Sequence, residues 1–377
     1  MTIARRRVAA GLLAAPLVAR TARGVASNPV APLVFSQAIE LSGPAARAGD
    51  SWRNGVEMAV QEINAGGGVL GRPVQMFTFN SNNGRGAIQR ALDGDIVALL
   101  GPVTSESVRM AAPLARAARI VQIVGADAPD LTAPGGTLFR TAPGPALRMP
   151  RLAAWLGDTA KARRVSLVWS NTEFGRGNRD LLARALRTAG LELASDHAVL
   201  PGPAGYAADV AAVARAAPDA AVVYLPEAEC VRFLQEARRQ ALPTPLLGDT
   251  TLAAPRVLAQ AGSAAEGVRC QLDFVATAPE VTAFRSRYTE MFKAEPDSAA
   301  AKGYTAVGLL AGGVARQSRP DRAELADTLR GLTLRAGEPA VIFDSSWDAA
   351  GDMDRVTFMV EIRDGHPTVL RTLGGPG

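Results

Sequence analysis

Polar side chains follow several of the short apolar runs of this sequence, at the points where strands would end. Ser105 and Asp127 follow the third and fourth runs, and Glu227 and Asp249 follow two later ones. Hydroxyl and carboxylate oxygens in such loops can hydrogen-bond a small polar ligand, beside the free backbone N–H groups of the helices that begin there. The pattern predicts the binding of a small molecule.

The residues that most hydrolases and metalloenzymes require are scarce or wrongly placed. His197 and His366 are the two histidines, and neither has metal-ligand spacing or a recognisable nucleophile context. Gly66–Gly71 matches the glycine pattern of dinucleotide sites, but it follows a predicted helix and precedes a predicted strand, the reverse of the required order. We therefore expect no enzyme, no cofactor and no metal site. An exported hydrolase that uses a carboxylate pair remains the alternative.

Short β-rich runs alternate with amphipathic stretches along the chain. Val56, Ala59, Val60 and Ile63 recur at helical spacing and predict a helix with one apolar face. The predicted strands are Leu33–Ile39, Val74–Phe79, Ile96–Leu100, Ile120–Val124, Val165–Trp169, Ala220–Leu225 and Pro245–Leu247. This alternation is typical of α/β folds in which helices flank mostly parallel sheets. A chain of 377 residues exceeds the size of a single core, so we expect two lobes.

Leu41–Pro44 and the segment Gly55–Val74 carry a family resemblance. They resemble the opening of periplasmic solute-binding proteins of the leucine/isoleucine/valine-binding type, which serve branched-chain amino-acid ABC importers. The resemblance implies a ligand carrier with the periplasmic-binding-protein type I fold, in which two lobes are joined by three crossovers. We expect the first crossover at the Pro/Gly-rich passage Thr141–Pro150, and the resemblance implies the others near Cys270–Ala276 and Thr333–Val341.

This architecture gives a domain assignment in separated segments. Residues 1–26 are expected to be a signal peptide. Residues 27–142 plus 275–334 would form the N-terminal lobe, and residues 143–274 plus 335–377 the C-terminal lobe.

The resemblance also assigns roles to the loop residues. Ser105 falls on a serine that holds the ligand's carboxylate, and Gly125 lies among the small residues of the next loop. Phe174 matches an aromatic residue that packs on the ligand's apolar part, and Asp249 an acidic partner for its ammonium. Glu227 lies where the family commonly has glycine and tyrosine, and we include it as a further ligand-binding candidate.

Each of these residues also has a structural interpretation. Ser105 lies where the N-cap of a helix is expected, and Asp249 could cap the helix that follows it. Phe174 could pack in the hinge, and Glu227 could place charge in the first turn of a helix.

Two substitutions bear on specificity. Asp127 stands where the family has a threonine, and a carboxylate there would repel a ligand carboxylate unless a cation lay between them or one were protonated. Either Asp127 points away, or the ligand is cationic or amide-like; Asp249 entering from the other lobe strengthens this expectation. Ala48 replaces the family's aromatic residue, which leaves Trp52 as a possible wall.

The N-terminus predicts export. Arg5–Arg7 precede the apolar run Val8–Ala19, which is too short for a membrane anchor and typical of a secretory signal. The first 26 residues hold five arginines and no acidic residue, so their removal brings the net charge from +5 to zero. This balance gives no case for nucleic acid, and we expect a periplasmic mature chain without stable membrane insertion.

The resemblance implies a partner as well. The chain would deliver its small-molecule ligand to an inner-membrane ABC permease, while a ligand sensor of the same fold is the alternative.

Cys230 shares helical spacing with apolar residues and is expected in the core. The compartment permits a disulfide between Cys230 and Cys270, and the sequence leaves this open.

Overall fold

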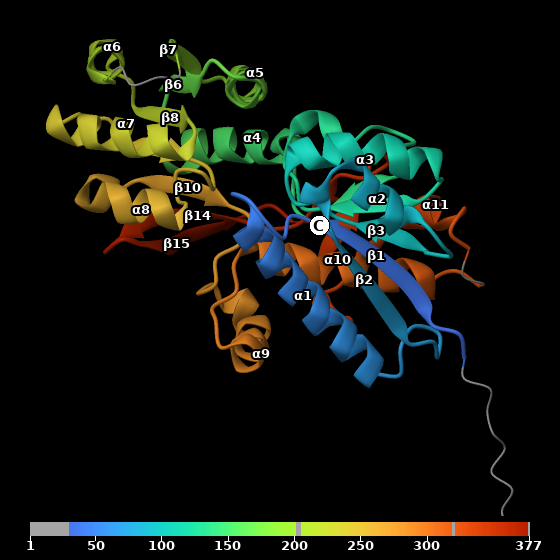
Figure 1. Ribbon diagram of the computed structural model, residues 1–377. Coiled ribbons are helices and arrows are strands. Elements are labelled where there is room, and N and C mark those ends of the chain that lie inside the picture. Colours follow the sequence, from blue (N-terminus) through green and yellow to red (C-terminus); the bar gives the residue numbers. More distant parts are fainter. Residues whose placement is uncertain (1–29, 201–204, 319–320, 376–377) are drawn as a thin grey trace, which may run out of the picture.

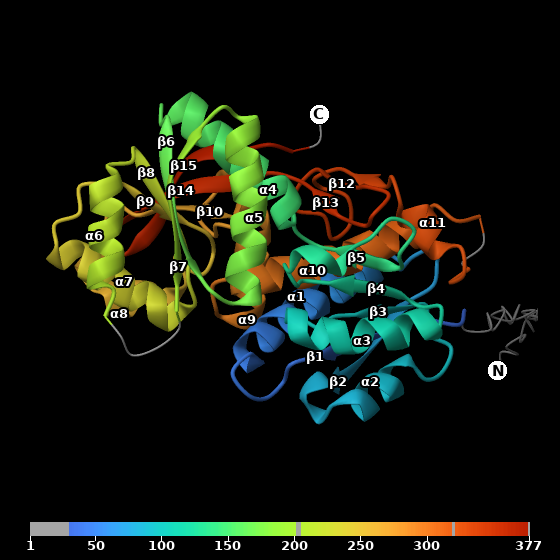
Figure 2. The ribbon, with the colours of Figure 1, turned by 90° about the horizontal axis from the view of Figure 1, so that it is seen from above.

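The computed structural model describes residues 30–200, 205–318 and 321–375, apart from the side chains of Glu173 and Phe174. The expected signal peptide lies outside the described residues. Figures 1 and 2 show two lobes side by side, each a sheet covered by helices. This is the two-lobed α/β architecture that the sequence predicts.

The first lobe is built on a parallel five-stranded sheet in the order β2-β1-β3-β4-β5. Its strands are β1 (Leu33–Ile39), β2 (Val74–Asn80), β3 (Ala98–Leu100), β4 (Val121–Val124) and β5 (Leu138–Arg140). The helices of this lobe are α1 (Ala46–Ala65), α2 (Arg85–Leu92), α3 (Ser105–Ala117), α9 (Thr282–Phe292), α10 (Ser298–Ala315) and α11 (Leu325–Leu329).

Alternation along β1 places helices on both faces of this sheet. Leu33 and Phe35 are buried in the core shared with α1 and α10, whereas Ala38 is buried against α2 and α3. Helices α1 and α10 touch through glycines, since a Cβ on Gly55 would lie 2.0 Å from the carbonyl oxygen of Ala300. The close approach fixes α10 beside the loops that leave the sheet.

The second lobe has a mixed seven-stranded sheet in the order β15-β14-β10-β9-β8-β6-β7. Its strands are β6 (Arg164–Ser170), β7 (Glu192–Val199), β8 (Ala220–Tyr224), β9 (Leu246–Gly248), β10 (Arg269–Leu272), β14 (Thr357–Arg363) and β15 (His366–Leu373). The helices are α4 (Pro145–Ala154), α5 (Glu173–Thr188), α6 (Ala207–Ala216), α7 (Glu227–Arg239) and α8 (Pro255–Ala261). Helices α4 and α5 share an apolar core with one face of the sheet, and α6, α7 and α8 cover the other.

A small sheet of β11 (Thr333–Leu334), β12 (Ser345–Trp347) and β13 (Met353–Asp354) lies beside the first lobe. The Trp347 indole donates to the carbonyl of Arg140 on β5 at 2.8 Å, and the Arg140 guanidinium pairs with Asp352. The resemblance placed the third crossover near residues 333–341. We propose, on these contacts, that it lies after Asp354.

All seven predicted strands are present, with ends shifted by at most two residues. The glycine run at residues 66–71 forms the turn between α1 and β2, and Gly68 has a φ of +77° with its Cβ direction blocked by the backbone of Arg72. A turn therefore replaces any dinucleotide loop there. Strand β5, the largely polar β7 and the strands after β9 were not predicted from the sequence.

Candidate functional site

A cavity of about 540 Å³ lies between the lobes, where loops from both sheets meet. Its lining residues are Ser105, Arg109, Asp127, Ala128, Pro129, Asp130, Arg148, Gly177, Asn178, Asp249, Thr250 and Thr251. The structure thus brings together Ser105, Asp127 and Asp249 from the predicted set. A cavity of this size, with many polar side chains converging on it from two lobes, suits a small polar ligand.

The cap of α3 differs from the expectation. Thr104 is the N-cap, because its extended backbone lets its side-chain oxygen accept a hydrogen bond from the Ser107 N–H at 3.4 Å. Ser105 is the first residue inside the helix, and its hydroxyl oxygen accepts from the Ala128 N–H at 3.2 Å. The predicted capping role of Ser105 is wrong, and its hydroxyl instead ties α3 to the Asp127 loop at the cavity wall.

We expect Ser105→Ala to weaken ligand binding by about 1–3 kcal/mol, because the substitution removes the hydroxyl and with it a charge-assisted hydrogen bond to the ligand. Thr104→Ala is the matched control, since Thr104 caps the same helix outside the cavity lining. The control should lower the free energy of unfolding by about 1 kcal/mol and leave affinity unchanged. Calorimetric titration and thermal melting of both variants measure this, and equal affinity losses would contradict a ligand contact at Ser105.

Asp127 is held by two cations that come from distant segments. The Nζ of Lys302 lies 3.4 Å from Asp127 Oδ1, and a guanidinium nitrogen of Arg148 lies 3.9 Å from Oδ2. The Asp127 side chain stays 36% exposed and lines the cavity. The protein itself therefore supplies positive charge beside Asp127, one of the conditions under which a ligand carboxylate could be accommodated there.

Lys302 links this loop to the segment that follows β10. Its Nζ also lies 3.1 Å from Asp273 Oδ2, and Asp273 accepts a hydrogen bond from Ser298 at 2.9 Å. Burial alone would raise the pKa of Asp273, but Lys302 and Arg355 outweigh it and hold that pKa well below its usual range. Burial alone would lower the pKa of Lys302, but Asp127 and Asp273 raise it overall. Both groups are therefore ionised at neutral pH.

Asp249 enters the cavity from the loop after β9. Its carboxylate accepts from the Thr251 N–H at 3.0 Å, and its side chain is buried. The N-cap of α8 is Ala254, so the predicted alternative of helix capping is wrong. Burial raises the pKa of Asp249, while Arg148 acts in the opposite direction. A cationic group on a ligand would stabilise the ionised form of this buried carboxylate.

Glu227 lies apart from the other predicted residues. It is the exposed first residue of α7 and lines a neighbouring cavity of about 810 Å³, together with Ala48 and Thr250. Thr250 lines both cavities, so the cavity that Glu227 lines adjoins the inner one. Its acidic position in the first turn of α7 agrees with the structural interpretation.

Gly125 does not enter the described lining of the inner cavity. A Cβ on Gly125 would lie 2.7 Å from the ring of Trp52, which is fully buried against that loop. The absence of a side chain at Gly125 therefore lets the Trp52 ring pack directly against the backbone of this loop. Phe174 lies in α5, and its side chain is outside the described residues.

Sequence reasoning missed Arg148, Lys302 and Arg140. Lys302 is the one charged residue of α10, a helix otherwise made of small and apolar residues, and that isolation was an available signal of a paired buried charge. Arg140 donates to the carbonyls of Ala126 at 2.8 Å and Ala128 at 2.5 Å, and so fixes the backbone on both sides of Asp127. Arg148 carries no comparable signal in the sequence.

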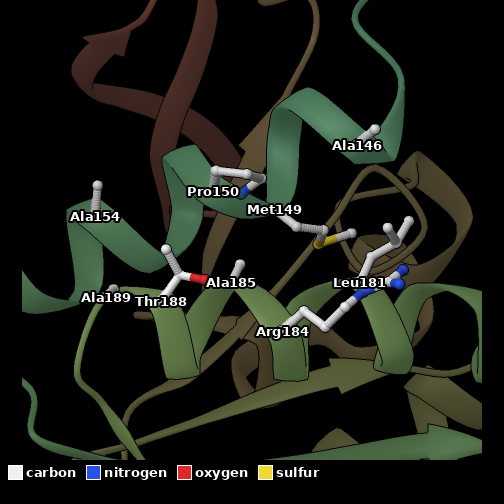
Figure 3. Close-up of a pocket in the computed structure, with 9 residues that line it drawn as sticks. All are labelled: Ala146, Met149, Pro150, Ala154, Leu181, Arg184, Ala185, Thr188 and Ala189. Atoms are coloured by element: carbon white, nitrogen blue, oxygen red, sulfur yellow. The ribbon is translucent and has the colours of Figure 1, made fainter.

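Another cavity, of about 430 Å³, lies on the second lobe between α4 and α5 (Figure 3). It is lined mainly by apolar side chains, with Met149 and Leu181 pointing into it, and contains none of the predicted site residues.

Cys230 and Cys270 are both buried and free, and the Cys230 thiol donates to the Leu225 carbonyl at 3.1 Å. The expected core position of Cys230 is confirmed. Of the helices that the structure describes, none has the length and apolar character needed to cross a membrane.

Known proteins match this chain along almost its whole length. It is 26% identical over 332 residues to the Leu/Ile/Val-binding protein of Citrobacter freundii, covering 85% of this chain and 88% of that protein. A putative branched-chain amino acid ABC transporter from Rhodospirillum rubrum superimposes with a TM-score of 0.77 at 26% identity, covering 90% of this chain and 100% of that one. An ABC transporter substrate-binding protein from Desulfitobacterium hafniense, solved in complex with Leu, gives 0.77 at 23% identity over 90% and 100% of the two chains.

The sequence profile described as periplasmic binding protein matches residues 38–367, a span that includes both lobes and every residue of the interlobe cavity. The match agrees with the two-lobed α/β fold and with a cavity lined from both lobes. This chain belongs to the periplasmic binding protein family.

Proposed function

We propose that this protein is the solute-binding component of an ABC importer, which captures an amino acid or a close derivative between its lobes. The observation that carries the proposal is the 540 Å³ cavity, lined by Ser105 and Asp127 from one lobe and by Asp249 from the other. Members of the periplasmic binding protein family, to which this chain belongs, bind and release a solute. The N-terminal signal would place the mature chain in the periplasm, where it would meet an inner-membrane permease.

The charges of the cavity support a zwitterionic cargo. Asp249 is buried and accepts a hydrogen bond from the neutral backbone N–H of Thr251, so its carboxylate would bind an ammonium group. Asp127 is already paired with Lys302 and would not exclude a carboxylate. The Leu/Ile/Val-binding relative and the leucine complex fit this reading. The earlier expectation of a cationic or amide-like ligand loses its electrostatic reason.

Capture would proceed by closure of the lobes. A ligand that contacts both walls binds the closed form more tightly than the open form, and it shifts the equilibrium by that difference in affinity. We expect saturating leucine to decrease the radius of gyration of the mature chain in small-angle scattering. Leucinol, which lacks the carboxylate, is the control compound and should produce a smaller decrease at equal concentration. An unchanged radius with every amino acid tested would contradict the proposal.

A further inference from the structure

The second lobe presents a buried guanidinium to the interlobe cavity. Arg148 is 4% exposed and lies in the cavity wall, on the first turns of α4. Its neighbour Met149 lines the separate apolar cavity between α4 and α5 (Figure 3), and the Met149 sulfur accepts a hydrogen bond from Tyr224 on β8 at 3.0 Å. Met149 and Leu152 thus anchor α4 in the second lobe and fix Arg148 at the cleft.

The hydrogen-bonding capacity of Arg148 is largely unused within the part of the chain that the structure describes. Its Nε is buried without a hydrogen-bond partner, and its closest carboxylate, Asp127, stands 3.9 Å away. That distance exceeds the 2.7–2.9 Å typical of a charge-assisted bond. Asp127 and Asp273 already have the ammonium of Lys302 at shorter distances. Burial lowers the pKa of Arg148, and the charges of Asp127, Asp249 and Asp273 raise it overall, but its buried Nε still lacks a hydrogen-bond acceptor that an anionic ligand group could supply.

From this geometry we propose that Arg148 is a specificity-determining residue, which binds the carboxylate of the solute from the second lobe. The inference rests on the proposed function and names the class of solute: small organic acids, zwitterionic amino acids included. Asp249 lines the same cavity from the same lobe, so one zwitterion could satisfy both side chains. The carboxylate would then bridge Arg148 and the Ser105 wall, which couples recognition to closure.

The test compares solutes that differ only at this group. Wild-type protein is titrated with free amino acids and small monocarboxylic acids, each paired with its primary amide, beginning with leucine and leucinamide. The expected wild-type result is a preference for the acid. Arg148→Gln should weaken acid binding about 10- to 100-fold, as expected for a lost charge-assisted contact, with amide binding changed less than threefold. Arg148→Lys keeps the charge without the planar fork and should recover part of the preference.

The matched control is Arg184→Gln, an exposed arginine on α5 that lines the separate apolar cavity, and it should change neither affinity. Thermal melting of each variant separates binding from folding, and Arg148→Lys remains informative if the glutamine variant unfolds. An acid preference that survives Arg148→Gln, or an equal loss for acid and amide, would overturn the inference. Wild-type binding of amides or cations alone would overturn it and leave the solute-binding function standing. Absence of binding to every compound would contradict the proposed function itself.

Discussion

Replacing Lys302 with methionine should lower the free energy of unfolding by about 3–5 kcal/mol, because removing one partner of a buried ion pair leaves the other charge uncompensated. The side chains of Lys302 and Asp273 are 9% and 3% exposed, and their charged atoms lie 3.1 Å apart. Methionine fills a similar volume, so the loss would report charge and not a cavity. Denaturant unfolding of the mature chain measures it.

The control is Lys293→Met, at an exposed lysine after α9, which should change stability by less than about 0.5 kcal/mol. Adding Asp273→Asn to the Lys302→Met variant should recover part of the loss, because the uncompensated carboxylate is removed. The single variant Lys302→Met should also bind leucine more weakly than the wild type, since Asp127 would lose its closest cation. A stability loss below about 1 kcal/mol would show that Asp273 does not depend on Lys302.

Arg140→Gln should lower the free energy of unfolding by about 3–5 kcal/mol, as Lys302→Met does, and it should also weaken leucine binding. The Arg140 side chain is 1% exposed, and its Nε lies 2.5 Å from Asp352 Oδ1. Its other nitrogens hold the carbonyls of Ala126 and Ala128, so glutamine would free the loop that carries Asp127. Unfolding and leucine titration of the same variant test both effects.

The matched control is Arg116→Gln, at an exposed arginine in the last turn of α3. It should leave affinity unchanged and stability within about 0.5 kcal/mol of the wild type. If Arg140→Gln loses stability but binds leucine with wild-type affinity, Arg140 would hold the small sheet in place without positioning the binding loop.

The strands that the sequence predicted and those it missed differ in a physical way. Strands β1, β6 and β8 are largely buried on both faces, so each is mostly apolar and can be predicted from its composition, although Ser36 and Gln37 interrupt β1 and Ser166 interrupts β6. Strand β7 lies at a sheet edge and reads ELASDHAV, a polar pattern that burial does not constrain. The β14–β15 hairpin pairs antiparallel at the other edge, where only one strand is shielded on both sides.

Local pattern also placed the binding loops, because a loop that follows a buried parallel strand must emerge at one edge of the sheet. The family resemblance then assigned Ser105, Asp127 and Asp249 to ligand-binding loops, and all three line the cavity. It could not tell which neighbour satisfies each of them. The N-cap is Thr104 and not Ser105, because the backbone of Thr104 is extended and α3 already begins at Ser105. The predicted cap was therefore displaced by one residue.

The sequence by itself determined the alternation of strands and helices, the two lobes and the acidic character of the loops, since these depend on residues close together in the chain. The electrostatics of the cavity were decided by tertiary structure alone. Lys302 lies 175 residues from Asp127, and Arg140 lies 212 residues from Asp352. Charge interactions depend on distance in space and on burial, and both are set only when the lobes fold and α10 packs against α1.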